Sequence, residues 1–417
     1  MPEELARRLG TADAVVVGLS AMIGAGVFAA FAPAAAAAGP WLPLSLALAA
    51  VVAYCNATSS ARLAALYPES GGTYVYGRRR LGHLWGYLAG WGFTVGKTAS
   101  CAAMALTFGA YAAPALARPL AIGAVVALTV LNLYGVQRSA GVARVLVAFV
   151  LAVLAAVVVA GLTSGVTESW VAYAPLTEPP GFDLRGVLQG GGLLFFAFAG
   201  YARIATLGEE VRDPARTIPR AVTVALGVTL VVYALVAFAA LRVLGDGPLA
   251  RSAAPLADLV RRAGAAWLVP VVQTGAAVAA LGALLALLLG VSRTVLAMAR
   301  ERDLPGVLAA VDPVRQVPRR AELAVGAAVV VLLLVADLRG AIGFSSFGVL
   351  VYYALANASA YTLSRAEGAP PKVVPVLGLA LCLVLAATLP LASVVAGLAV
   401  FAVGVVAWLA RHRPAPR

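Results

Sequence analysis

The sequence has few of the side chains that perform catalysis or bind metals. Its 417 residues include two histidines, three cysteines and 18 acidic residues. His83 and His412 are far apart, and neither a phosphate-binding loop nor a Ser/His/Asp set accompanies them. Cys55, Cys101 and Cys382 all fall within apolar stretches, which is typical of packing residues and not of a disulfide framework. We therefore expect no enzyme, no bound metal and no cofactor.

Charge is also scarce. Charged residues make up 12% of the chain, whereas an ordinary soluble domain has about 25%. Hydrophobic residues make up 62%, and the mean hydropathy is +0.94. Since a water-soluble core cannot bury this much apolar surface, we expect the lipid bilayer to surround the chain. Strands of alternating polarity are missing from the sequence, so the fold class is predicted to be an all-α membrane protein.

Long apolar stretches recur from one end of the chain to the other. A transmembrane helix needs about 20 predominantly apolar residues. The stretches that approach or exceed this length are 11–37, 41–66, 84–113, 117–134, 140–162, 186–208, 220–243, 265–298, 321–338, 341–364, 373–389 and 391–410. The sequence therefore predicts twelve transmembrane helices.

The net charge of +13 has an uneven distribution along the chain. If the N-terminus is cytoplasmic, most basic residues fall in the tails and in the connections on that side. The opposite side carries only Arg118, Arg185, Arg242, Arg251, Arg261, Arg262 and Arg339. This positive-inside pattern predicts a multi-pass protein of the cell (inner) membrane with cytoplasmic tails at 1–10 and 411–417. The basic residues thus indicate topology, and we expect no nucleic-acid partner.

One basic residue lies deep within an apolar stretch. Lys97 is near the middle of 84–113, too far from either end for its ammonium group to reach a membrane surface. Three interpretations remain open: a structural amine bound to helix-end carbonyls, a proton carrier, or a contact to an anionic substrate group. Acidic residues lie in loops or at helix ends, with Glu322 and Asp337 on either side of the ninth stretch. A carboxylate at mid-membrane depth is therefore not expected.

Two apolar stretches contain weak points near their centres. The first reads "GLSAMIGAGVFAAFAP" and has Gly24-Ala25-Gly26 in its middle, where helix propensity is low. Five stretches later, "FFAFAGY" places Gly200 between bulky aromatic residues. Many transporters bind their substrate near the midplane, at helices broken in corresponding positions of two repeats. The two glycine-containing segments therefore predict a substrate site.

Four motifs together resemble the amino acid–polyamine–organocation (APC) superfamily. They are "GLSAMIGAGVF", "LYPESGGTYVYGRRRLG", "FFAFAGY" followed by "EEVRDPARTIPRA", and "GVSRTVLAMARERDLP". Their order and spacing match that family over about residues 10–365. The resemblance implies the LeuT fold, with five-helix inverted repeats at 11–162 and 186–364. An extracellular loop at 163–185 would join the repeats, and two additional helices would follow at 365–410.

The resemblance also implies roles for individual residues. Backbone N–H groups of Ile23, Gly24, Ala25 and Gly26 would hold the substrate carboxylate. Backbone carbonyls of the second break would hold the amino group, with Phe196 as a gating aromatic; this segment comprises Phe195, Phe196, Ala197, Phe198, Ala199 and Gly200. Thr94 and Thr98 would line the side-chain pocket, which places Lys97 beside the substrate. Salt bridges between the loops "PESGGTYVYGRRR" and "EEVRDPARTIPR" would help to close the inner face.

Two departures from the family pattern concern ion coupling. The stretch Gly275–Val291 of the eighth helix has no Ser, Thr, Asn or Asp to bind sodium. The fifth helix has Val150 where some proton-coupled relatives carry a lysine. We therefore predict a sodium-independent permease for neutral amino acids, or for acidic ones, that works by alternating access and couples protons through Lys97.

Two alternatives remain open at this stage, as does the oligomeric state. One is an amino acid exchanger or facilitator in which Lys97 is structural. The other is a membrane sensor that binds amino acids without transporting them, although the sequence offers no long soluble domain for signalling.

Overall fold

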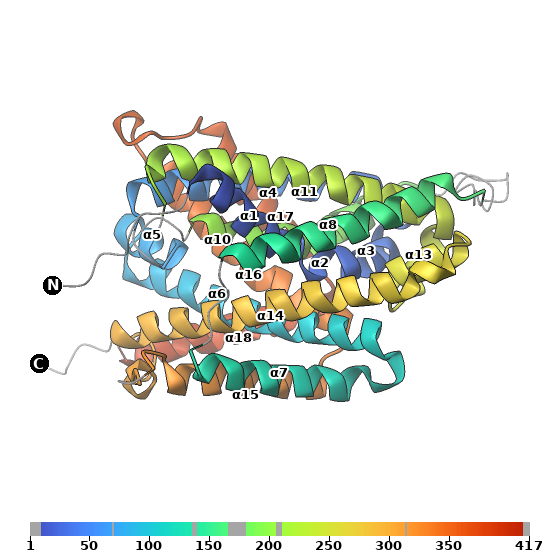
Figure 1. Ribbon diagram of the computed structural model, residues 1–417. Coiled ribbons are helices and arrows are strands. Elements are labelled where there is room, and N and C mark those ends of the chain that lie inside the picture. The colour runs from blue at the N-terminus through green and yellow to red at the C-terminus, as the bar shows by residue number, and fades with distance from the viewer. Residues whose placement is uncertain are drawn as a thin grey trace, which may run out of the picture.

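The structure is a computed structural model that describes residues 10–68, 71–135, 140–165, 181–205, 211–312 and 315–411. Throughout these ranges the regular secondary structure is helical. The long helices run along one common direction and form a bundle (Figure 1). The predicted all-α fold class is therefore confirmed for the described residues.

The long helices coincide with the apolar stretches of the sequence. The first stretch is divided into α1 (Thr11–Met22), α2 (Ala25–Ala29) and α3 (Phe31–Ala38), and the sixth into α9 (Leu184–Phe198), η3 (Ala199–Tyr201) and α10 (Ala202–Ala205). The others are α4 (Leu42–Leu66), α6 (His83–Ala112), α7 (Ala117–Leu133), α8 (Ala140–Thr163), α11 (Pro214–Leu244), α14 (Val269–Arg300), α15 (Arg319–Val335), α16 (Leu338–Tyr361), α17 (Val373–Thr388) and α18 (Leu391–Arg411).

Short helices occupy the connections. They are η1 (Gly39–Trp41), α5 (Thr73–Arg80), η2 (Pro114–Leu116), α12 (Asp246–Arg251), α13 (Pro255–Arg262), η4 (Ala266–Leu268), η5 (Gly306–Ala309) and η6 (Arg365–Glu367). Proline begins several of them, because its fixed φ suits the first helical turn and its missing N–H is not needed there.

Within the described ranges, nine segments are both long enough and apolar enough to cross a membrane. α6 has sufficient length, at 30 residues, but falls outside this set because it is less apolar. α15 and α17 are shorter, with 17 and 16 residues. The structure thus supports a multi-pass helical membrane protein, whereas the division into twelve spans and two inverted repeats stays a prediction.

α16 and α9 lie inside the bundle, and α18 lies at its edge. The apolar window of α16 is 83% buried and that of the segment Leu184–Ala205 is 72% buried, against 17% for α18. Large apolar side chains remain exposed at the periphery, including Val335 at 78%. Exposed apolar surface of this extent is typical of a protein that contacts lipid.

Small residues bring α6 and α16 into close contact. A Cβ atom on Gly348 of α16 would lie 2.9 Å from both the Gly92 carbonyl oxygen and the Gly96 Cα of α6. One turn further along, the Ser100 and Ser345 hydroxyls form a hydrogen bond of 2.6 Å. Glycine and serine permit such close helix packing inside membranes, where it replaces the hydrophobic driving force. α6 and α16 therefore pack as one unit.

Ion pairs join segments at one end of the bundle. Asp13 at the start of α1 pairs with Arg144 near the start of α8, and Arg80 of α5 pairs with Glu367 of η6. All four residues belong to connections or helix ends that the charge distribution assigns to the cytoplasm. Each pair shows that its two segments lie at the same end of the molecule, while the orientation of that end stays a prediction.

Candidate functional site

The first predicted break is present in the structure. α1 ends at Met22, and the next two residues leave the helical region, with ψ of 53° at Ile23 and φ/ψ of −101°/−143° at Gly24. The chain becomes helical again at Ala25. Since the first N–H groups of a helix have no acceptor in the preceding turn, this break leaves backbone donors without intrahelical partners in a buried segment.

The second break lies in the corresponding segment of the sixth stretch. α9 ends at Phe198, Ala199 has φ/ψ of −66°/5°, and the chain continues as the 3₁₀ turn η3 before α10. A 3₁₀ turn has a different hydrogen-bond pattern from an α-helix, so carbonyl groups at the junction become available to other donors. The carbonyls of Ala197 and Ala199 both accept hydrogen bonds from side chains of other helices.

The two breaks pack directly against each other. A Cβ atom on Gly26 would lie 2.7 Å from the Cα of Ala197, and one on Gly200 would lie 2.3 Å from the carbonyl oxygen of Ala21. Only glycine allows backbones to approach this closely. The residues predicted for the two breaks are buried, apart from Gly200, which is half-buried. The structure therefore brings the predicted segments 23–26 and 195–200 together, although their contact with substrate stays a prediction.

Tyr233 of α11 connects the two breaks. Its hydroxyl lies 2.6 Å from the carbonyl oxygen of Met22 and 3.1 Å from that of Ala197, while its ring packs edge-on against Phe198. Helix ends leave carbonyls without intrahelical partners, and a buried carbonyl without a donor is costly. A hydroxyl has one hydrogen, which Tyr233 can share between or alternate between the two carbonyls.

Replacing Tyr233 by phenylalanine tests this connection. The ring contact is retained and only the hydroxyl is lost, so we expect the free energy of unfolding to fall by about 1–3 kcal/mol. Thermal unfolding of the purified protein in detergent measures the change. The control is Tyr54→Phe, since the side chain of Tyr54 is 52% exposed on α4. Equal stability of the two variants would contradict the role of Tyr233.

Lys97 of α6 reaches the second break. Its side chain is 7% exposed, and its ammonium group donates to the Ala199 carbonyl oxygen over 3.3 Å. The Tyr353 hydroxyl of α16 donates to the same oxygen over 3.5 Å. A single carbonyl thus accepts from both members of the α6–α16 pair. This geometry agrees with the prediction that Lys97 lies beside the site, and it does not separate the three interpretations of its role.

The two threonines predicted to line the side-chain pocket have other hydrogen-bond partners. The Thr94 hydroxyl faces the Met298 sulfur of α14 at 3.8 Å, and the Thr98 hydroxyl donates to the Thr94 carbonyl within its own helix. Phe196, predicted as a gating aromatic, is 8% exposed. The pocket-lining and gating roles of these residues stay predictions.

Tyr233 and Tyr353 are not recognisable as site residues from the sequence alone. Both lie within long apolar helices, and their roles depend on which carbonyls the tertiary structure places opposite them. One signal was available, because a tyrosine hydroxyl inside an apolar helix must find a hydrogen-bond partner. The sequence does not show where that partner lies.

A second cluster closes one end of the bundle. Asp303 is 2% exposed and accepts from the Tyr74 hydroxyl at 2.7 Å, and its other oxygen lies 2.8 Å from the Nε2 of His83. Arg78 forms an ion pair with Glu301 at 2.9 Å and lies 3.6 Å from Asp303. Two of the four sequence motifs, "LYPESGGTYVYGRRRLG" and "GVSRTVLAMARERDLP", are therefore linked to each other.

The salt bridges predicted from the sequence for the inner face are not the Arg78–Glu301 pair described above. They would link the loops "PESGGTYVYGRRR" and "EEVRDPARTIPR", which include Glu209 and Glu210. These two residues lie outside the described residues, so that pairing stays a prediction.

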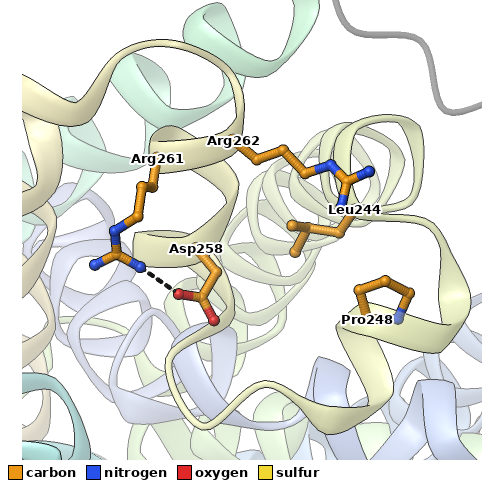
Figure 2. A pocket seen from close by; sticks show the side chains of 5 residues that line it. All are labelled: Leu244, Pro248, Asp258, Arg261 and Arg262. Atoms are coloured by element: carbon orange, nitrogen blue, oxygen red, sulfur yellow. Dashed lines mark hydrogen bonds and ion pairs between the residues drawn. The ribbon is translucent and has the colours of Figure 1, made fainter.

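A cavity of about 360 Å³ lies at the opposite end of α11 from its proline-rich start. Its lining comes from Leu244, Pro248, Asp258, Arg261 and Arg262, and Figure 2 shows Arg261 directed toward Asp258. The two side chains form a hydrogen bond of 2.6 Å. None of the predicted site residues lines this cavity, which is therefore separate from the two breaks.

Residues 9–411 match the family model described as amino acid permease. The chain belongs to this family. The resemblance to the APC superfamily that the motifs indicated is thereby confirmed.

Relatives of this amino acid permease family member are named as transporters. Identity is 66% over 414 residues with an uncharacterized transporter of Mycobacterium tuberculosis, covering 99% of this chain and 93% of that protein. It is 25% over 443 residues with a branched-chain amino acid permease of Bacillus subtilis, covering 99% and 94%. With the chloroplastic cationic amino acid transporter 7 of Arabidopsis thaliana it is 28% over 381 residues, covering 85% and 65%. These names point to a transporter rather than to an enzyme.

Proposed function

We propose that this protein is a secondary active transporter of amino acids that works by alternating access. The proposal depends on one observation: the first helix is interrupted at Ile23–Gly24, α9 passes into a 3₁₀ turn at Ala199, and these two points pack against each other in the bundle interior. Broken helices in this arrangement are how many transporters expose backbone dipoles to a substrate without placing charges in the membrane. The family match and the transporter-named relatives support the same conclusion.

The proposed substrate is a zwitterion held between the breaks. Backbone N–H groups at Ile23–Gly26 bind its carboxylate, and carbonyls near Ala197 and Ala199 bind its amino group. Twelve spans in two inverted five-helix repeats, with α17 and α18 as peripheral helices, would let one group of helices move against the other around this site. The buried Gly26–Ala197 contact supports this placement, because the two binding segments already lie together.

The proposed substrate class is neutral amino acids, and the proposed coupling ion is the proton. A protonated Lys97 beside the site would repel a cationic side chain, which disfavours arginine and polyamines. The eighth-helix stretch Gly275–Val291 has no side-chain oxygen for a sodium ion. Lys97, which is buried yet hydrogen-bonded to Ala199, is the group that we propose to gain and lose the coupled proton.

Uptake into proteoliposomes tests the function. With an inside-alkaline pH gradient, we expect leucine to accumulate above its external concentration at equal rates with and without sodium, and arginine not to accumulate. Counterflow exchange that persists while the gradient has no effect would make the protein an exchanger and contradict proton coupling. Leucine binding without uptake or exchange would make it a sensor and contradict transport altogether.

A further inference from the structure

Glu322 is a buried carboxyl group that the proposed transport site does not use. It lies in the first turn of α15, and its exposed fraction is 0%. One oxygen, Oε1, accepts a hydrogen bond of 2.7 Å from the Ser292 hydroxyl of α14. The other oxygen, Oε2, is buried without a hydrogen-bond partner among the described residues. From the sequence, Glu322 is expected at a helix end, where its burial is not apparent.

Two further buried polar side chains with unpaired atoms, Asn132 and Thr129, lie on α7, which packs against α15. Asn132 of α7 is 1% exposed and interacts with the Glu322 carboxyl group. Within the described part of the chain, neither amide atom of Asn132 has a geometrically good hydrogen bond, nor does the hydroxyl of Thr129, which is 6% exposed. Thr129 lies directly against Gly326, one helical turn beyond Glu322 on α15. Buried polar atoms are rarely left unpaired, so their concentration here indicates a site that takes up something further.

The charges near Glu322 are few. Arg293 of α14, whose side chain is exposed, acts on the carboxyl group electrostatically but forms no salt bridge with it in the described structure. On α6, Cys101 lies within electrostatic range. The remaining neighbours, α7 and η5, contribute no charged side chain near Glu322, and Arg319 and Arg320 of its own helix are exposed. Among the described residues, the carboxylate therefore has no close cation of its own.

A single proton would satisfy part of this arrangement, namely Glu322 Oε2 and one acceptor on Asn132. On Oε2 it converts the carboxylate to a neutral acid, removes the cost of a buried unpaired charge, and provides an O–H donor for the Asn132 amide oxygen. The helix N-terminus and Arg293 favour the charged form instead. Because these opposing influences act on one group, small movements of α7, α14 or α15 would shift the balance between them.

We propose that Glu322, with Asn132, Thr129 and Ser292, forms a proton-binding site. When the site is hydrated, the carboxylate takes a proton from a hydronium ion and leaves a water molecule. When the helices part, the acid returns the proton to water as hydronium. Participation of this proton in transport rests on the proposed function, whereas the presence of the proton does not. The site would be a second proton-carrying group, on helices other than those of Lys97 and the two breaks.

Infrared difference spectroscopy of the purified full-length protein tests proton binding without any transport measurement. We expect the carbonyl stretch of a buried protonated carboxyl group, shifted in D₂O and lost at alkaline pH. Glu322→Gln should lose this band, and the control Asp183→Asn, at an exposed helix start, should keep it. If Glu322→Gln fails to fold, Ser292→Ala should shift the band by removing the hydrogen bond to Oε1.

Two results would overturn the proton-binding site, and a third would overturn only its part in transport. One is a spectrum in which the band is missing, or in which Glu322→Gln or Ser292→Ala leaves it unchanged. Another is thermal stabilisation by sodium that Glu322→Gln abolishes, which would make the site a metal-cation site. The third concerns transport: we expect Glu322→Gln to reduce gradient-driven uptake about tenfold, and unchanged uptake with a lost band would show a proton that takes no part in the cycle.

Discussion

Replacing Lys97 by alanine is expected to reduce gradient-driven amino acid accumulation strongly while substrate binding persists. The ammonium group donates to the Ala199 carbonyl oxygen at the second break. A change in its protonation would therefore change the hydrogen bonding at the place where the substrate amino group is proposed to bind. Coupling free energies between sites are about 1–3 kcal/mol, and uptake should therefore fall by about 5- to 150-fold. Binding measured by calorimetry and uptake measured in proteoliposomes, on the same preparation, separate the two effects.

Two variants serve as controls for Lys97. Lys372 is the other lysine of the chain, and it donates to the Leu363 carbonyl at the bundle end, so Lys372→Ala should leave coupling intact. Lys97→Arg keeps the positive charge and the donor but does not release its proton, so it should bind substrate without coupled uptake. Full activity of Lys97→Arg would show that Lys97 is structural. Loss of binding in Lys97→Ala would instead make it a substrate contact.

Replacing Gly200 by alanine is expected to lower substrate affinity by about tenfold or more. The added Cβ would lie 2.3 Å from the Ala21 carbonyl oxygen and 2.6 Å from the Met22 amide nitrogen. These are backbone atoms, which cannot rotate away as a side chain can, so the two breaks would have to separate. Overpacking of this kind costs about 1–3 kcal/mol, and about 1.4 kcal/mol corresponds to a tenfold change in affinity. Calorimetric titration with leucine measures it.

Two other glycines provide matched controls for this substitution. Gly227 of α11 and Gly290 of α14 have nothing within 4 Å of the position that a Cβ would occupy. Alanine is the better helix former by about 1 kcal/mol, so Gly227→Ala and Gly290→Ala should keep full affinity and unfold at equal or higher temperature. If all three variants bind leucine equally, close approach of the breaks is not needed for binding, and the proposed site is wrong.

The sequence predicted the helical segments and the helix breaks because both depend on local properties. Apolar stretches that are long enough to span lipid form helices, because an α-helix pairs all of its backbone hydrogen-bonding groups within the segment. Gly24 and Gly200 weaken their helices locally, and the breaks occur at Ile23–Gly24 and at Ala199, within one residue of these glycines. The sequence could therefore predict the positions at which helix propensity is low.

The contacts between residues that are far apart in the chain could not be predicted from the sequence. Tyr233 bridges two breaks that are far from it in the chain, and Glu322 is buried because α7 and α14 cover the start of α15. The ninth apolar stretch placed Glu322 at a membrane boundary, where a carboxylate is normally solvated. Its burial depends on three helices meeting, which hydropathy along one chain does not report. The spacing of Lys97 from the helix ends, by contrast, was enough to predict that it lies inside.

The hydrogen bond from Lys97 to Ala199 would compete with binding of the proposed substrate's amino group at the same carbonyl oxygen. The ammonium group of Lys97 donates to the carbonyl oxygen of Ala199, which is also a proposed acceptor for the amino group of the substrate. The protein therefore supplies an amine of its own at this position. Under the proposed mechanism, an arriving amino acid would displace this internal amine, and the displaced group could then change its protonation. Ligand exchange at one backbone oxygen would thereby link occupancy of the site to movement of a proton.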